Sequence, residues 1–173
     1  MKIVTTPMCE DVLKIAGVDA YSVVMPDKIG ESDVAVVLSE SKASDSHIGL
    51  KLNTYEQVLD SVNIIADYFG STPDERQLAH IKMLDEDNRS KRKTRGNVRV
   101  KVFSNFLCEC VADMGYVIDN ENYDYVVIPD YMQTDVNYED AIIVASHSNV
   151  SKGIVERIKA RYDFLECKLC TKQ

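Results

Sequence analysis

Apolar and polar positions alternate along the chain with two different periods, and they predict a series of α/β elements in its first part. Residues 2–5 have the pattern of a strand, and a short helix pattern follows that ends at Gly17, where glycine tolerates a left-handed backbone. A second strand is expected over residues 20–25. The nearly uninterrupted β-branched run over residues 33–39 predicts a strand that is buried on both faces, as in a mostly parallel sheet.

The pattern then changes from strands to helices. Residues 48–52 alternate between apolar and polar side chains, which predicts a short strand with one buried face. Thr54 and Gln57 form a capping box at the start of an amphipathic helix. A further helix is expected to begin near Pro73, with this proline in its first turn, and to end near Leu84.

The second part of the chain repeats this order of elements. Its first strand alternates apolar and basic residues from Val98 to Val102. The remaining elements are a helix over residues 105–114, strands over residues 116–118, 125–128 and 141–145, and a last helix that Ser151 caps.

The two parts also begin with similar residues. Residues 4–10 (VTTPMCE) and 103–109 (FSNFLCE) share a Cys-Glu doublet, and a glycine follows each doublet at Gly17 and Gly115. We interpret this as an internal duplication of an α/β fold, with two Rossmann-like β-α-β-β-β-α pseudo-repeats that pack as two lobes around a cleft. A chance similarity between two α/β segments is the alternative.

This interpretation divides the chain into three parts. The first α/β lobe covers residues 1–70, a linking helix and basic connector cover residues 71–96, and the second lobe covers residues 97–173.

Composition excludes several classes of protein. The chain has 173 residues, of which 45% are hydrophobic, and can therefore bury a substantial core. Its formal net charge of −8 argues against nucleic-acid binding, because general nucleic-acid binders neutralise phosphates with Lys and Arg. Neither a secretory signal pattern nor an apolar run of about 18 residues is visible, so we expect a cytoplasmic protein without a membrane partner. The odd number of cysteines, five, agrees with a reducing compartment.

Positive charge is concentrated in one short segment. Seven of the 20 Lys and Arg residues lie within positions 89–101. One interpretation is a solvated connector between the two repeats. The other is a surface that binds a small anionic ligand or an acidic protein partner, formed by Arg89, Lys91, Arg92, Lys93 and Arg95.

Helical geometry separates the cysteines that begin the two repeats. The apolar stripe of residues 107–114 places Cys110 in the core and turns Cys108 away from it, and the same construction leaves Cys9 off the stripe of its helix. We therefore expect Cys9 and Cys108 in the first turn of a helix, where unpaired amides and the dipole favour a thiolate, although a neighbouring glutamate opposes this in each case. The two cysteines are candidates for cofactor or metal ligation, for a nucleophile, or for ordinary half-buried thiols.

Four further residues are candidate metal ligands. Cys167 and Cys170 share a helix face at a spacing that zinc and iron–sulfur proteins use, although surface thiols near the end of a helix are the alternative. His47 and His147 each follow a serine after a strand-like run, and two imidazoles with two thiols would suit zinc. Solvated or structural histidines are the alternative. Zinc and an iron–sulfur cluster are therefore the cofactors that these residues allow.

One acidic loop lies after a predicted buried strand, at the edge where α/β sheets bind ligands. Its carboxylates could hold a hard cation, and ordinary surface acidity is the alternative. The residues are Asp130, Asp135, Glu139 and Asp140.

Two segments near the start of the chain carry a family resemblance. Residues 3–10 (IVTTPMCE) and 33–40 (DVAVVLSE) resemble small uncharacterised proteins of methanogenic archaea, including those grouped as methanogenesis marker proteins. The resemblance implies an anaerobic cytoplasm in which iron–sulfur chemistry is common, and an accessory role near methanogenesis. It assigns no catalytic residues.

These observations favour a binding or accessory protein over an enzyme. Its interlobe cleft is expected to hold a metal, an iron–sulfur centre or a small anion. The first alternative is a small enzyme that uses Cys9 or Cys108 as its nucleophile. The second is a protein-docking module without a ligand, which binds its partner through the basic segment.

Overall fold

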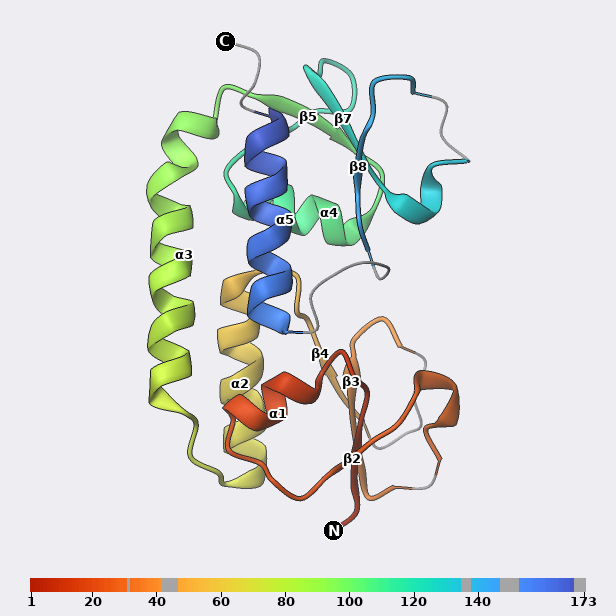
Figure 1. Ribbon diagram of the computed structural model, residues 1–173, viewed down its shortest axis with the longest axis vertical. Coiled ribbons are helices and arrows are strands. Elements are labelled where there is room, and N and C mark those ends of the chain that lie inside the picture. Colours follow the sequence, from red (N-terminus) through yellow and green to blue (C-terminus); the bar gives the residue numbers. More distant parts are fainter. Residues whose placement is uncertain (31, 42–46, 135–137, 147–152, 170–173) are drawn as a thin grey trace. The chain divides into compact units, whose positions relative to one another are not determined.

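The protein contains two α/β units. The computed structural model describes residues 1–30, 32–41, 47–134, 138–146 and 153–169 (Figure 1). The chain divides into unit 1, Met1–Lys82, and unit 2, Met83–Gln173. Helix α3 (Glu75–Arg95) contains the boundary between the units.

Unit 1 has a four-stranded sheet with the strand order β2-β1-β3-β4, and every neighbouring pair is parallel. The long helix of this unit begins where the sequence predicts, because the Thr54 side chain accepts a hydrogen bond from the amide of Gln57. The elements are β1 (Ile3–Thr5), α1 (Glu10–Ile15), β2 (Ser22–Val23), the 3-10 helix η1 (Pro26–Lys28), β3 (Val34–Leu38), β4 (His47–Leu50) and α2 (Tyr55–Phe69).

Unit 2 repeats this topology. Its four strands are again parallel and lie in the order β6-β5-β7-β8, which is the order of unit 1 with each strand replaced by its counterpart. The two β-α-β-β-β-α pseudo-repeats are therefore confirmed. The elements are β5 (Arg99–Val102), α4 (Asn105–Asp113), β6 (Val117–Ile118), β7 (Tyr125–Pro129), the 3-10 helix η2 (Asp130–Met132), β8 (Ile142–Val144) and α5 (Ile154–Leu169).

The core of each unit lies against the central strands. Four of the five residues of β3 and four of the five of β7 are buried, as their β-branched runs predict. On one face of the unit 1 sheet, Val4, Ala35 and Val37 form an apolar cluster that Val24 and Ile29 cover. The residue of unit 2 at the strand position of Val4 is Lys101, because Val4 pairs with β3 as Lys101 pairs with β7.

Lys101 changes what covers this face in unit 2. Its ammonium nitrogen lies 5.5 Å from the ring centroid of Phe103, 5.1 Å from that of Tyr123 and 5.5 Å from that of Tyr138. Three aromatic rings around a cation thus take the place of the apolar cluster of unit 1.

The linking segment differs from the prediction. A helix ending near Leu84 and a connector over the basic residues were expected, but α3 continues without interruption to Arg95. Its second half has few apolar residues, so hydrophobic periodicity could not detect it. Polar side chains hold it in place instead, because Asn88 and Arg95 are 4% and 3% exposed.

The first helices of the two units end in the same way. Gly17 and Gly115 both have a positive φ, of 76° and 89°. The amide of the following residue bonds the carbonyl five positions earlier in both units, from Val18 to Leu13 (2.9 Å) and from Tyr116 to Val111 (3.2 Å). The helices therefore correspond with an offset of 98 residues, the difference between 17 and 115.

This offset corrects the expected match between the two Cys-Glu doublets. Cys9 and Cys108 are 99 positions apart, so the helix residue that corresponds to Cys9 is Leu107. Both Cys9 and Leu107 are fully buried, as this alignment requires. The prediction that Cys9 lies off the apolar stripe is therefore wrong, whereas the prediction that Cys110 is more buried than Cys108 is confirmed.

Within the described ranges, no helix is both long and apolar enough to cross a membrane.

Candidate functional site

Polar side chains gather at the carboxyl edge of the unit 2 sheet. Ser104 comes two residues after β5, Asp130 directly follows β7, and Ser146 comes two residues after β8. The order of the strands reverses between β5 and β7, since β5 connects through α4 to β6 on its other side. Ligands of open α/β sheets bind at such a position, outside the carboxyl ends of the strands. Ser104, Asp130 and Ser146 are therefore the first candidates for contact with a ligand.

A buried arginine from α5 reaches the same edge. Arg161 is 8% exposed, and its guanidinium donates hydrogen bonds to the carbonyl oxygens of Ala145 (3.4 Å) and Ser146 (2.7 Å). The guanidinium carbon also lies 5.1 Å from the ring centroid of Phe106, in the first turn of α4. Arg161 therefore connects the end of β8 with the beginning of α4.

The charge of Arg161 is only partly compensated. Among the described residues it forms no ion pair with a carboxylate, and burial lowers its pKa below the ordinary value. The nearby carboxylate of Asp130 acts in the opposite direction, but its Oδ1 atom accepts hydrogen bonds from the Ser146 hydroxyl (2.5 Å) and from the amide of Tyr131 (3.0 Å). A cation that is largely removed from water without an ion pair is energetically unfavourable.

Ser104 has an unused hydroxyl at this edge. It is the N-cap residue of α4, but its side chain makes no capping hydrogen bond. Its Oγ atom is buried and has no hydrogen-bond partner among the described residues. The first amides of a helix lack intrahelical acceptors, so the start of α4 offers donors that Ser104 does not satisfy.

The corresponding edge of unit 1 carries threonines. Thr5 ends β1 and Thr6 follows it, and the two are 0% and 2% exposed. The Thr5 hydroxyl donates to the carbonyl of Val36 at 3.0 Å. Thr54, 5% exposed, lies after β4 and accepts from the amide of Gln57. Thr6 corresponds to Ser104 in the 98-residue offset. The described part of this edge carries no buried arginine.

The candidate thiols do not lie where a reactive thiolate was expected. Cys9 is the N-cap residue of α1 and has no exposed surface. Cys108 is the fourth residue of α4, and its amide bonds the Ser104 carbonyl at 2.9 Å, so the expected unpaired amide is absent. Partial burial and Glu109 raise the pKa of Cys108, and burial raises the pKa of Cys110 to about 12.

The structure does not bring the other metal-ligand candidates together. His47 begins β4 and pairs with Ala35 near the start of β3, whereas Cys9 follows the opposite, carboxyl end of β1. The expected match between His47 and His147 stays a prediction. Cys167 is exposed on α5. His147 and Cys170 lie outside the described residues.

Among the residues that the structure describes, no group of three or more His, Cys, Asp and Glu side chains could hold a metal ion. In the acidic loop, Asp135 lies outside the described residues. The assignment of Cys9, Cys108, Cys167, Cys170, His47 and His147 to a metal remains a prediction.

The basic segment of α3 is engaged within unit 2. Arg92 and Arg95 form the deepest of its contacts, at the end of α4. Arg92 pairs with the carboxylate of Asp113 (2.5 Å) and donates to its carbonyl oxygen (2.7 Å). Arg95 pairs with Glu166 at 2.9 Å and donates to the carbonyl of Met114 at 3.0 Å.

Two further basic residues of this segment lie in ion pairs. Arg89 contacts Asp85 and Lys91 contacts Asp87, each at 2.7 Å. Lys93 is exposed. Its role, and the binding of an anion or an acidic partner by the segment as a whole, stay predictions.

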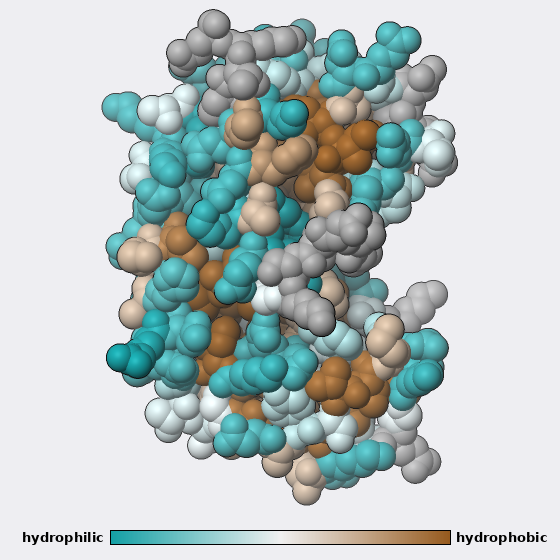
Figure 2. Space-filling view, viewed as in Figure 1, coloured by the Kyte–Doolittle hydropathy of each residue, from teal (hydrophilic) through white to brown (hydrophobic). Residues whose placement is uncertain are grey.

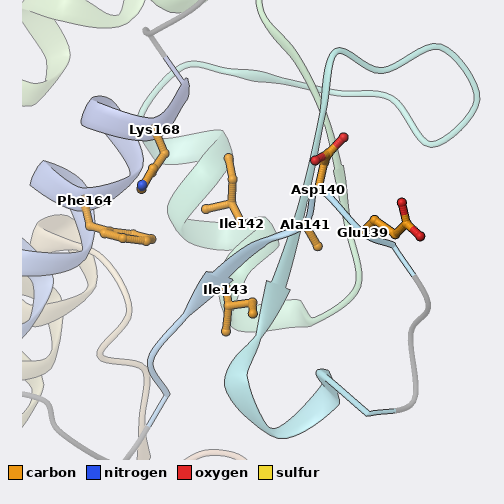
Figure 3. A pocket seen from close by; sticks show the side chains of 7 residues that line it. All are labelled: Glu139, Asp140, Ala141, Ile142, Ile143, Phe164 and Lys168. Atoms are coloured by element: carbon orange, nitrogen blue, oxygen red, sulfur yellow. The ribbon is translucent and has the colours of Figure 1, made fainter.

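A surface pocket lies at the other edge of the unit 2 sheet. It has a volume of about 430 Å³ between β8 and the C-terminal half of α5. Figure 3 shows Phe164 and Lys168 of α5 on one side and Ile142 and Ile143 of β8 on the other. Apolar surface is visible in this part of the protein (Figure 2), but the pocket lining also includes the charged residues Glu139, Asp140 and Lys168. Because residues 139–141 of its wall precede β8, the pocket lies at the amino edge, away from Arg161 and Ser104.

Sequence patterns missed Ser104, Ser146 and Arg161 as candidates. A weak signal existed for Arg161, because it lies next to the apolar position Tyr162 and one turn after Arg157 on the same face of the last helix. Both arginines are buried. Asp130 was considered at this edge, and the structure places it there.

Comparisons with known proteins cover the C-terminal part and the fold. Residues 97–169 match the model of the MJ0786 family C-terminal domain. No curated protein matches the sequence.

Two solved structures resemble the whole chain. One is a Zn(II)-bound variant of AdcAII from Streptococcus pneumoniae, with a TM-score of 0.58, 12% identity and 98% coverage of both chains. The other is a metal-free variant of a periplasmic metal-binding protein from Candidatus Liberibacter asiaticus, with a TM-score of 0.52 and 6% identity over 98% of this chain and 100% of that chain. At these identities the likeness concerns the fold.

Proposed function

We propose that the protein binds a small ligand at the carboxyl edges of its parallel sheets. One observation carries this proposal: five of the ten buried polar side chains among the described residues lie at this edge, and both units contribute to them. They are Thr5, Thr6 and Thr54 in unit 1 and Ser146 and Arg161 in unit 2. Burying polar groups is costly, and a ligand that completes their hydrogen bonds would compensate for part of the cost.

The fold supports a binding protein. The two solved structures that resemble the whole chain are described as Zn(II)-bound and as a metal-binding protein. The duplicated topology also gives two carboxyl edges in one chain, each next to a strand-order reversal. An enzyme that uses a cysteine nucleophile has less support, because Cys9 is buried and the pKa of Cys108 is raised.

Metal is the second candidate ligand, and the fold of the zinc-bound neighbour favours it. Such a metal would require ligands beyond the groups in the described residues. We further propose a cytoplasmic accessory role in methanogenic archaea. In this role an iron–sulfur cluster is an alternative to a single metal ion as the ligand. The match to a family named after a protein of a methanogenic archaeon supports this setting.

The test is purification of the full chain without oxygen, followed by analysis of what it carries. Metal and acid-labile sulfide are measured on one portion, and native mass spectrometry with denaturing extraction identifies small organic ligands in another. Thermal unfolding with a panel of divalent metals, phosphate and carboxylates then detects ligands lost during purification.

We expect at least one class of ligand to co-purify or to raise the melting temperature in a saturable way. A protein that carries nothing and is stabilised by no member of the panel would contradict the proposal. In that case a ligand-free docking module would be the better description.

A further inference from the structure

We infer that the carboxyl edge of the unit 2 sheet binds a small carboxylate through Arg161, the hydroxyl of Ser104 and the first amides of α4. This inference rests on the proposed function and gives it a ligand class and a position.

The first step is the charge of Arg161. A guanidinium has five N–H donors, and the hydrogen bonds of Arg161 to the described residues use its Nε atom and its Nη2 atom, both on backbone carbonyls. Carbonyl oxygens satisfy donors but do not neutralise the charge. The side chain is 8% exposed, and among the described residues it has no ion pair. Its remaining donors suit a bidentate anion.

The second step is the position of Arg161 against α4. The guanidinium carbon lies 5.1 Å from the ring centroid of Phe106, the second residue of this helix. The amides of the first turn carry partial positive charge and point away from the helix body. A buried cation and a helix N-terminus therefore lie close together, and an anion placed between them would interact favourably with both.

The third step is Ser104. An N-cap serine normally satisfies one amide of the first turn, but the Ser104 side chain does not. Its buried Oγ atom is left without a partner among the described residues. A ligand oxygen that accepts from this hydroxyl would satisfy both the hydroxyl and the amides beside it. This buried polar atom is an observation independent of the helix dipole.

The fourth step selects the class of anion. The negative charge of Asp130 acts on Arg161 and raises its pKa, opposing the effect of burial. The Ser146 hydroxyl donates a hydrogen bond to the Asp130 carboxylate and holds it at this edge. Asp130 offsets part of the positive charge of Arg161, so a phosphate dianion would leave excess negative charge at a buried edge, and a singly charged anion is favoured. A carboxylate has one charge and the planar geometry that matches a guanidinium. A small carboxylate therefore fits the site better than phosphate.

The test uses the full chain and three probes at equal ionic strength: sodium acetate, potassium phosphate and sodium chloride. Amide shifts in a ¹H–¹⁵N spectrum report the position of binding, and their titration gives Kd. We expect acetate to shift the amides of Asn105, Phe106 and Leu107 in a saturable way, with weaker effects of phosphate and none of chloride.

Ser104→Ala and Ser32→Ala form a matched pair of variants. Both remove a buried hydroxyl oxygen that has no partner among the described residues, but Ser32 lies in unit 1, before β3. Ser104→Ala is expected to weaken acetate binding roughly 10-fold, the loss of one hydrogen bond to a charged group, with an unchanged melting temperature in the absence of ligand. Ser32→Ala should bind acetate as the unchanged protein does. Arg161→Lys keeps the charge but loses the planar fork, so it should weaken binding at least as much.

Several results would overturn the inference. They are equal shifts with acetate and chloride, shifts that do not include the first turn of α4, and acetate binding that Ser104→Ala leaves intact. If acetate fails but a metal or another ligand stabilises the chain, the carboxylate site is wrong and the proposed binding function stands. If nothing binds, both fail.

Discussion

The C-terminal ends of α1 and α4 are the most informative places at which to compare the two units. In unit 1, the carbonyls of Ile15 and Ala16 accept hydrogen bonds from the amide of Asp74 (2.8 Å) and the hydroxyl of Ser71 (2.5 Å). These donors come from the segment just before α3.

In unit 2, the corresponding carbonyls belong to Asp113 and Met114, 98 positions later. They accept from the side chains of Asn88, Arg92 and Arg95 in the second half of α3. The last carbonyls of a helix have no intrahelical donors. In unit 1 the segment before α3 supplies the donors, whereas in unit 2 the long side chains of α3 supply them. This difference accounts for two of the basic residues in the segment, Arg92 and Arg95.

The largest loss of stability is expected from substitution of the glycines at these helix ends, where another segment of the chain passes close to the backbone. A Cβ atom on Gly17 would lie 2.2 Å from the carbonyl oxygen of Thr72, and one on Gly115 would lie 2.7 Å from Cβ of Arg92. Because both glycines also have a positive φ, Gly17→Ala and Gly115→Ala should each lower the free energy of unfolding by on the order of 3 kcal/mol. Denaturant unfolding measures this.

Gly70 is the control for the backbone alone. It has a φ of 63°, but a Cβ atom on Gly70 would have no described atom within 4 Å, so Gly70→Ala should cost about 1 kcal/mol. Equal costs at all three glycines would show that the close approach to the helix ends is not part of the folded structure.

Asp113 is the next most sensitive residue, because it anchors three side chains in unit 2. Its carboxylate accepts from Asn88 (2.9 Å), Arg92 (2.5 Å) and the hydroxyl of Tyr162 (2.5 Å). The corresponding residue of unit 1 is the apolar Ile15. Asp113→Ala should therefore cost about 3 kcal/mol, since it leaves partly buried donors without an acceptor.

Lys93→Ala serves as the matched control on the same helix. Lys93 is exposed, so its replacement should change stability by less than about 0.5 kcal/mol. If Asp113→Ala were as mild as Lys93→Ala in urea unfolding, the basic segment would not be a structural anchor, and the interpretation as a binding surface would gain support.

These contacts also show what the sequence could and could not predict. The order of the elements along the chain and the parallel sheets were predicted from β-branched runs and glycine stops, which act locally. The second half of α3 was missed because its contacts with Asp113 and Glu166 lie far away in sequence and involve polar groups. Hydrophobic periodicity carries no information about such contacts.

The candidate site was missed for a related reason. Ser104, Ser146 and Arg161 are ordinary residues in the sequence, and only the parallel pairing of β5, β7 and β8 brings them to one edge. The Cys-Glu doublets were more conspicuous. However, the two helices differ by one residue in phase, and a one-residue shift turns a helical side chain by about 100°, which is enough to bury Cys9.

The cysteines test the one-residue difference in phase between α1 and α4. Cys9 and Cys110 have no exposed surface, so Cys9→Ser and Cys110→Ser should each cost about 1–3 kcal/mol by burying a hydroxyl. Cys108→Ser should be tolerated, because this side chain is only half-buried. A tolerated Cys9→Ser would favour the alignment in which the two Cys-Glu doublets coincide.

Alkylation gives a second measurement of cysteine burial. Near neutral pH the reagent should modify the exposed Cys167 before it modifies the buried cysteines. Cys110, whose pKa is raised to about 12, should react only when the protein unfolds.

The smallest effect is expected at Lys101. This residue has the strand position in unit 2 that Val4 has in unit 1, and three aromatic rings surround its ammonium group. A hydrogen bond with Tyr138 raises the pKa of Lys101, and the same bond lowers the pKa of Tyr138. A raised lysine pKa gives stability that is complete below its ordinary value of 10.5 and is lost as the pH rises through the value in the folded protein.

Tyr138→Phe keeps the ring over Lys101 but removes this hydrogen bond. The pKa of Lys101, measured from the NMR shift of its side chain, should therefore move down towards its ordinary value, and the loss of stability that Lys101 contributes at alkaline pH should become smaller. Tyr131→Phe is the control, because Tyr131 is 56% exposed and is not one of the three rings around Lys101. If Tyr138→Phe left the titration of Lys101 unchanged, the rings would cover this face by packing alone, as Val24 and Ile29 do in unit 1. The two units would then differ at this position only in one residue, lysine in place of valine, and packing would cover the sheet face in both.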